Sequence, residues 1–232
     1  MKKYELTTET LQFAGRTLHR IKAVKDFGSI KAGEFGGYIE NEKNLSQDDN
    51  AWIYGEAMAI GNARVFGNAK ILGNAHIFGN AKVFDSARVY DDARVYDDAI
   101  VHNNARIYDN AIVYDNAIVS DYAVVCENAK VCDDADVYGW TRIFGNAKIF
   151  GNATIKGNAK VHDDIDYIVF KNFWSSGRYF TWTRSNNKWS VGCFYGTGEE
   201  LIKKAYADSD TSGREYERVV RYVESILADE RK

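Results

Sequence analysis

His102 and Ser120 are the side chains of this sequence best suited to nucleophilic chemistry. An imidazole can act as the base that activates a hydroxyl nucleophile, but only when the two side chains touch. The two residues are eighteen positions apart, so they become neighbours only if the chain returns to the same place every eighteen residues. His76 is a second histidine that could act as a base, although no serine stands at the matching distance.

Acidic residues concentrate between positions 85 and 138, where twelve acidic side chains stand against four basic ones. Asp97, Asp115 and Asp133 follow one another at the same interval of eighteen residues. Carboxylates held close together repel one another unless they are protonated, neutralised by arginine or bridged by a cation. Because calcium prefers oxygen ligands, these three residues are candidate calcium ligands. The alternative, which we favour, is a set of solvated carboxylates partly offset by nearby arginines.

Arginine and tyrosine side chains recur together in the same part of the chain. A guanidinium group beside an aromatic ring can supply both the charge and the stacking surface that hold a nucleotide. One hypothesis is therefore that the protein sequesters a small nucleotide-like ligand between subunits. The residues concerned are Arg88, Tyr90, Arg94, Tyr96, Arg106 and Tyr108.

A six-residue repeat explains these intervals. Alanine is expected at every sixth position from Ala51 to Ala159, nineteen positions of which Thr141 is the one exception. A β-branched residue, which favours strands, stands two residues later in eighteen of the nineteen repeats. A period of six would scatter the alanines around every side of an α-helix. The repeat instead predicts a solenoid.

Three such repeats would make one triangular coil, in which residues eighteen apart stack at the ordinary interstrand spacing of about 4.8 Å. Each repeat then supplies a strand of about four residues with its β-branched side chain pointing inward, and alanine fills the inner corner. Gly, Asn and Asp stand at the two corner positions, where we expect the positive φ angles that these residues tolerate. Stacked asparagines should form hydrogen-bonded ladders from coil to coil.

The pattern of an aliphatic residue followed four positions later by a small residue resembles the motif of the hexapeptide-repeat superfamily, from Ala51 to about Val161. The resemblance implies an all-β solenoid, the left-handed parallel β-helix, and the handedness comes from the resemblance alone. The superfamily includes acyltransferases, nucleotidyltransferases, carbonic anhydrases and proteins with no known reaction. The resemblance therefore implies a fold but no single function.

The acyltransferases of this superfamily use one histidine as a general base on the acceptor substrate. The resemblance therefore implies His102, and less well His76, as the base of a coenzyme A-dependent acyltransferase. Those enzymes usually interrupt the β-helix with a long loop, whereas the repeats here contain no insertion, so we favour His102 and Ser120 as ordinary surface residues. A carbonic anhydrase of this fold is also disfavoured, because His76, His102 and His162 are expected on different faces.

The outward positions of the predicted coils are rich in aromatic side chains. Stacked rings stabilise parallel coils, and exposed apolar patches mark binding surfaces, so both interpretations stay open. Neighbouring outward positions, filled mainly by Lys and Arg, turn aliphatic in the middle coils. We predict self-association there, as a trimer because that is the habit of the superfamily. The candidate interface residues are Ile100, Ile112, Ile118 and Val124.

Three regions are expected along the chain. Residues 1–50 depart from the repeat and should form an N-terminal cap with irregular coils. Residues 51–164 should form the β-helix, and residues 165–232 a small C-terminal α+β domain. The two flanking regions resemble parts of uncharacterised bacterial and prophage hexapeptide-repeat proteins, which implies a phage or prophage origin.

The C-terminal domain is expected to consist of a β-meander and two helices. Thr197 has the features of a helix N-cap, with Glu199 and Glu200 in the first turn. We interpret the aromatic side chains here as the domain's own core rather than as base-stacking residues. Cys193 is expected in a strand of that core. The strand candidates span residues 167–173, 178–184 and 188–194, and the helices residues 198–207 and 212–229.

Composition excludes several other classes of protein. The net charge is −3, from 30 Lys+Arg against 33 Asp+Glu, which argues against bulk binding of nucleic-acid backbones. Three cysteines argue against a disulfide scaffold and favour a reducing compartment. The longest apolar stretch, Tyr122 to Cys126, has five residues. We therefore expect no membrane span and no secretion signal, and predict a cytoplasmic location.

These observations favour a non-catalytic, oligomeric β-helix scaffold that binds a small molecule or a protein, with the C-terminal domain as its specificity element. No cofactor is expected for this function. A coenzyme A-dependent acyltransferase is the first alternative, and the sequestration of a nucleotide-like ligand is the second.

Overall fold

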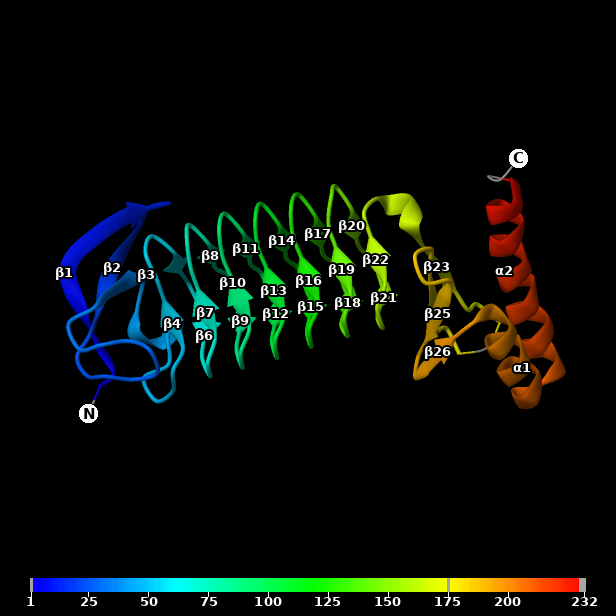
Figure 1. Ribbon diagram of the computed structural model, residues 1–232, viewed down its shortest axis with the longest axis horizontal. Helices are drawn as coiled ribbons and strands as arrows, with labels where there is room; N and C mark the ends of the chain where they lie inside the picture. Colours follow the sequence, from blue (N-terminus) through cyan, green and yellow to red (C-terminus); the bar gives the residue numbers. More distant parts are fainter. Residues whose placement is uncertain (1, 175, 230–232) are drawn as a thin grey trace.

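The protein is an elongated rod in the computed structural model, which describes residues 2–174 and 176–229. An N-terminal cap, a stack of coils and a C-terminal sheet with two helices follow one another along its long axis (Figure 1). Among the described helices, none is long and apolar enough to cross a membrane.

Three parallel sheets form the stack, and each sheet is one face of the triangular coil. The first face comprises β4 (Trp52–Ile53), β7 (Lys70–Ile71), β10 (Arg88–Val89), β13 (Arg106–Ile107), β16 (Val124–Val125), β19 (Arg142–Ile143) and β22 (Lys160–Val161). The second face comprises β5 (Met58–Ala59), β8 (His76–Ile77), β11 (Arg94–Val95), β14 (Ile112–Val113), β17 (Lys130–Val131) and β20 (Lys148–Ile149). The third face comprises β6 (Arg64–Val65), β9 (Lys82–Val83), β12 (Ile100–Val101), β15 (Ile118–Val119), β18 (Asp136–Val137) and β21 (Thr154–Ile155).

Residues eighteen apart pair across neighbouring strands, as Val89 pairs with Ile107. The repeated alanines and β-branched residues are buried along the whole stack. Burial of each such aliphatic side chain contributes about 1.5–3 kcal/mol, so the stack contains its own core. The predicted fold class, a solenoid of parallel coils with a small C-terminal α+β region, is confirmed. Its strands are shorter than predicted, with two residues each.

The two corner positions of each repeat differ in conformation. Positive φ angles occur at the first position, for example 71° at Gly67 and 54° at Asp85, but not at the second position of the described repeats. The prediction of positive φ at both positions was therefore wrong. The second position instead forms the predicted side-chain ladder, in which Asn62 Nδ2 donates to Asn80 Oδ1 at 3.0 Å. The amide of Asn80 then donates to Asp98 Oδ1 at 3.1 Å.

Carboxylates at the first corner position bind the backbone of the next coil. Asp109 Oδ2 accepts the N–H of Glu127 at 3.0 Å, and Asp133 Oδ2 accepts the N–H of Gly151 at 2.8 Å. These N–H groups would otherwise lack a partner at the corner. Part of the acidic excess therefore serves the backbone of the β-helix.

The N-terminal cap joins the β-helix through its backbone. An antiparallel hairpin leads into a strand that continues the second face beside β5. Gly37 allows the close approach, because a Cβ atom there would lie 2.3 Å from the Ala57 carbonyl oxygen. Irregular coils were predicted here, and the hairpin was missed. The elements are β1 (Tyr4–Phe13), β2 (Arg16–Ala23), β3 (Phe35–Ile39) and the 3-10 turn η1 (Glu42–Asn44).

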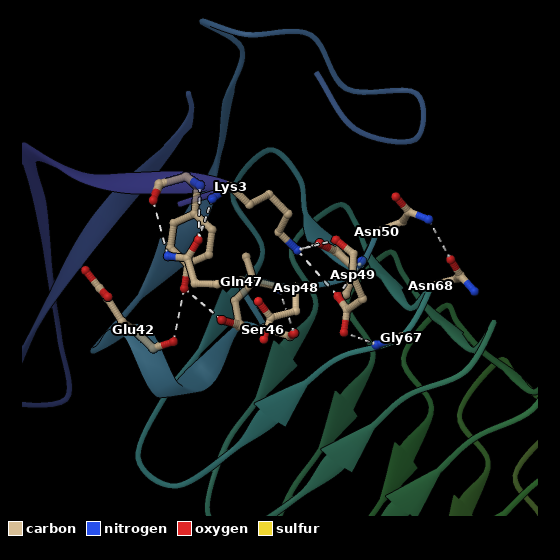
Figure 2. Close-up of polar contacts among 12 residues, drawn as sticks. Lys3, Glu42, Ser46, Gln47, Asp48, Asp49, Asn50, Gly67 and Asn68 are labelled. Atoms are coloured by element: carbon tan, nitrogen blue, oxygen red, sulfur yellow. Dashed lines mark hydrogen bonds and ion pairs between the residues drawn. The ribbon is translucent and has the colours of Figure 1, made fainter. Parts of the chain in front are cut away.

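Lys3 closes the open end of the first coil (Figure 2). Its Nζ donates to the carbonyl oxygens of Asp49 and Ala51, each at 2.9 Å, and the side chain is 1% exposed. Burial lowers the pKa of Lys3, although the carboxylate of Asp49, 3.4 Å away, opposes this effect. The cap therefore uses a buried ammonium group to satisfy carbonyl groups that no earlier coil covers.

The C-terminal region is a four-stranded antiparallel sheet with two helices on the side turned away from the β-helix (Figure 1). Trp182 and Trp189 are 1% and 2% exposed in the core between sheet and helices, which confirms the predicted role of the aromatic side chains. Thr197 caps the first helix in a capping box with Glu200. Cys193 is exposed, so its predicted burial was wrong. The elements are η2 (Asp164–Asp166), β23 (Tyr167–Lys171), β24 (Tyr179–Thr183), β25 (Lys188–Val191), β26 (Phe194–Gly196), α1 (Gly198–Asp208) and α2 (Asp210–Asp229).

The last coil meets this region through side chains. The three parallel sheets end at β20, β21 and β22, and no described strand continues them. One N–H group from each of these strands donates to a side-chain oxygen that follows the β-helix in sequence. The pairs are Lys148 with Asp164 at 2.7 Å, Thr154 with Thr181 at 2.9 Å, and Lys160 with Ser185 at 2.7 Å.

Candidate functional site: a groove beside the N-terminal hairpin

A groove of about 670 Å³ lies between the tip of the β1–β2 hairpin and the second face of the β-helix. Small-molecule sites typically have volumes of about 300–1,000 Å³. Phe13 of the hairpin forms one apolar wall, and Ile60 and Phe78 of the second face form the other. A small apolar cluster that includes Leu18 and Met58 fixes the hairpin to this face.

His76 and Arg94 bring polar groups to this groove. They are cross-strand neighbours in β8 and β11, and the ring of Phe13 packs edge-on against the His76 imidazole with 5.2 Å between ring centres. Burial, and then the charge of Arg94, lower the pKa of His76, which favours its neutral imidazole. Among the described residues, neither side chain has a hydrogen-bond or ion-pair partner.

Arg16, the other arginine of the groove, is held by Glu40. Its Nη1 lies 2.8 Å from Oε1 and 2.9 Å from Oε2 of that carboxylate. Glu40 Oε2 also accepts the N–H of Gly61 at 2.6 Å, and these bonds lower the pKa of Glu40. In the described part of the chain, Arg94 is thus the guanidinium of the groove that has no carboxylate partner.

His102 and Ser120 lie on adjacent coils of the third face, but no hydrogen bond joins their side chains in the described structure. The His102 ring stacks on Phe84 with 4.9 Å between centres, and its Nδ1 is 3.7 Å from Asp85 Oδ2. Ser120 is 8% exposed. The roles of Ser120 as nucleophile and His102 as base therefore stay a prediction.

The predicted set of arginines and tyrosines is divided between two faces. On the first face, Arg88, Tyr90 and Arg106 line a cleft of about 330 Å³. Tyr90 stacks there on Tyr108, with 4.9 Å between ring centres. The two remaining members, Arg94 and Tyr96, lie on the second face.

Two of the three candidate calcium ligands come together. Carboxylate oxygens of Asp115 and Asp133 and the sulfur of Cys132 lie within 4.8 Å of one another, whereas Asp97 is outside this group. Asp115 Oδ2 also accepts the N–H of Asp133 at 3.2 Å. The calcium site stays a prediction, with part of its ligand set already bound to the backbone.

The predicted interface residues are half-buried and lie on all three faces. Ile100 and Ile118 are cross-strand neighbours on the third face. Ile112 on the second face and Val124 on the first each stand between two cationic side chains. The third face therefore carries the contiguous aliphatic pair.

Aromatic ladders run along the coils as the sequence indicated. Phe66 and Phe84 stack with 4.7 Å between ring centres and 4° between ring planes. Such stacks add to the stability of the coils. The outward aromatic residues therefore have a structural role whatever else they bind.

Part of the central repeat region is similar to known proteins. Residues 87–103, 105–121 and 113–127 match the family described as YdcK beta solenoid repeat. The central region is a hexapeptide-repeat β-helix. One relative, the protein named uncharacterized acetyltransferase YdcK of Escherichia coli (strain K12), is 36% identical over 64 residues. This match spans 24% of the chain and only 20% of the relative's length.

Sequence reasoning placed His76 and Arg94 side by side but missed the groove above the hexapeptide-repeat β-helix. The missing part is the hairpin, which brings Phe13 and Arg16 over the second face. The sequence signal for its turn is Gly15. In the structure Ala14 and Gly15 have positive φ angles of 48° and 75°. A glycine between two strand-forming segments is typical of such turns.

Proposed function

We propose that this protein is a non-catalytic β-helix scaffold that binds a small ligand with an apolar body in the groove beside its hairpin. The groove itself carries the proposal, because it combines a ligand-sized volume, walls formed by Phe13, Ile60 and Phe78, and polar groups without partners. Apolar pockets with a few polar groups are the usual form of a small-molecule site.

Binding of the neutral apolar dye N-phenylnaphthylamine tests this proposal. We expect its fluorescence to rise on binding, and Phe13→Ala to weaken binding by about threefold or more, because it removes one wall of the groove. The control is Phe173→Ala in the C-terminal region, where the ring is 85% exposed. A dye that does not bind, or binding lost only in the control, would contradict the proposal.

Self-association through the third face belongs to the same proposal, with a trimer as the expected assembly. Ile100 and Ile118 support this choice of face, because their side chains are adjacent and half-buried. Each symmetry-related aliphatic side chain that becomes buried favours association by about 1.5–3 kcal/mol.

Light scattering of the intact chain measures this assembly. We expect Ile118→Lys to dissociate it, and Ile112→Lys, on the second face, to leave it intact. A monomer at tens of micromolar protein, as an order of magnitude for weak assemblies, would contradict self-association. Dissociation by Ile112→Lys alone would move the interface to the second face.

Acyl transfer is a second candidate, favoured by the position of His76. Its neutral imidazole borders the groove, as a general base on an acceptor substrate must border its site. The YdcK relative is named an uncharacterized acetyltransferase. This candidate requires an acyl-coenzyme A as the acyl donor.

Incubation with acetyl coenzyme A and a panel of amine acceptors tests the second candidate. Release of free thiol that His76→Ala abolishes and His102→Ala leaves unchanged would establish acyl transfer in the groove. We expect no release above the rate without protein. Turnover lost in His102→Ala would instead favour the third-face pair of His102 and Ser120.

A further inference from the structure

Arg94 gives the groove a chemical preference that its apolar walls do not explain. The other arginine of the groove, Arg16, is bound by both oxygens of Glu40. Arg94 has no such partner among the described residues, although it borders the same cavity. Its guanidinium therefore keeps its hydrogen-bond donors free for a ligand.

The backbone position of Arg94 is fixed by the coil, and its two cross-strand neighbours are neutral or apolar. In its sheet it stands between His76 and Ile112. Burial and the charge of Arg94 lower the pKa of His76 and so favour its neutral imidazole. A ligand on this side of the groove thus contacts the positive charge of Arg94, the imidazole of His76 and an apolar wall. That combination is complementary to an anion with an apolar body.

We propose that the groove binds amphiphilic anions, in which a carboxylate, sulfonate or phosphate group contacts Arg94 and an apolar body packs between Phe13 and Phe78. This inference rests on the proposed binding function and names the chemical class of its ligand. One face of Phe78 already stacks on Tyr96, with 4.6 Å between ring centres, so the apolar body packs against the remaining surface of that ring. The shape of the groove therefore places few limits on the apolar part of the ligand, and the contact with Arg94 selects for anions.

A pair of dyes with the same rings separates the anion contact from apolar binding. Anilinonaphthalene sulfonate carries the charge, and N-phenylnaphthylamine does not. We expect the sulfonate to bind more tightly to the parent protein. Arg94→Ala should weaken the sulfonate by about 10- to 100-fold, the range for loss of a charge-assisted hydrogen bond, and should change the neutral dye by less than about twofold.

Arg106→Ala is the matched control, because Arg106 is an exposed strand arginine that lines the separate cleft on the first face. It should leave the affinities of both dyes unchanged. Loss of sulfonate binding in Arg106→Ala would place the anion on the first face and overturn the inference.

The two proposals fail in different ways. Equal affinities of the two dyes, or an equal loss of both in Arg94→Ala, would overturn the anion contact while groove binding stands. Absence of binding by both dyes would overturn groove binding itself. Circular dichroism of each variant checks that the β-helix is folded, so that a loss of affinity reports the contact.

Discussion

The two ends of the β-helix are closed in different ways. At the N-terminal end, β3 continues the second face with backbone pairs, and Lys3 satisfies two further carbonyl groups from a buried position. At the C-terminal end the sheets stop, and the oxygens of Asp164, Thr181 and Ser185 accept the final N–H groups. The N-terminal cap thus continues the β-helix, whereas the C-terminal region, with a core of its own, only contacts its last coil.

This difference predicts unequal energetic costs at the two ends. A buried polar group that loses its partner costs about 1–3 kcal/mol, and a group near water costs less. The N-terminal closure concentrates several bonds on one buried side chain, whereas the C-terminal closure spreads single bonds over three side chains. Substitutions at the N-terminal end should therefore have the larger effects, and a middle coil serves as a reference.

Lys3→Met should have the largest effect. The substitution leaves the carbonyl groups of Asp49 and Ala51 buried without their donor, and we expect a loss of about 3 kcal/mol in the free energy of unfolding. Urea denaturation measures it, with Lys2→Met as the control because Lys2 is 61% exposed in its pair with Glu42. Similar losses in the two variants would mean that the buried ammonium does not hold the cap.

Asp115→Ala, in a middle coil, should cost about 2 kcal/mol. Alanine is strained at the φ of 56° found here and cannot accept the N–H of Asp133. Asp115→Asn keeps an acceptor and tolerates this φ, so we expect a change of less than about 0.5 kcal/mol. Thermal unfolding with calcium uses the same pair: a rise in Tm for the parent that Asp115→Asn abolishes would establish the calcium site.

Thr181→Val should cost about 1 kcal/mol, because the variant keeps the shape of a buried side chain but removes the acceptor of the Thr154 N–H. Ser185→Ala should cost less, since Ser185 is exposed. Urea denaturation of both variants beside Lys3→Met provides the comparison of the two ends. A loss for Thr181→Val that equals that for Lys3→Met would remove the proposed difference.

Thr141→Ala should have an effect of the opposite sign. Thr141 replaces the repeated alanine, and its hydroxyl is buried without a hydrogen-bond partner in the described structure. Removal of an unsatisfied buried hydroxyl should stabilise the chain by about 0.5–1 kcal/mol. A melting temperature below that of the parent protein would contradict this expectation.

Periodicity made the β-helix predictable from the sequence, including the pairing of His76 with Arg94 and of Ile100 with Ile118. Each of these pairs follows from the interval of eighteen residues alone. The fate of the acidic residues did not follow, because the pattern of charges does not distinguish a cation ligand from an acceptor for backbone N–H groups. Asp109 shows the second role in the structure.

The groove was beyond sequence reasoning for a different reason. Its wall at Phe13 belongs to a hairpin outside the repeat, and the position of that hairpin depends on tertiary contacts such as the one between Phe13 and His76. Local propensities identify a turn at Gly15 but do not orient the strands that meet there. A site formed between a repeated and a non-repeated segment can therefore be located only in the structure.

The corner contacts also determine how the length of this rod can change. Each Asp at the first corner position, such as Asp109, reaches a backbone N–H eighteen residues later, so a single inserted residue would misalign every ladder that crosses it. An insertion of one entire coil would preserve all of them and move the two closures apart by about 4.8 Å. The length of the molecule can therefore change only in steps of one coil, and such a change would require no new contacts at either end.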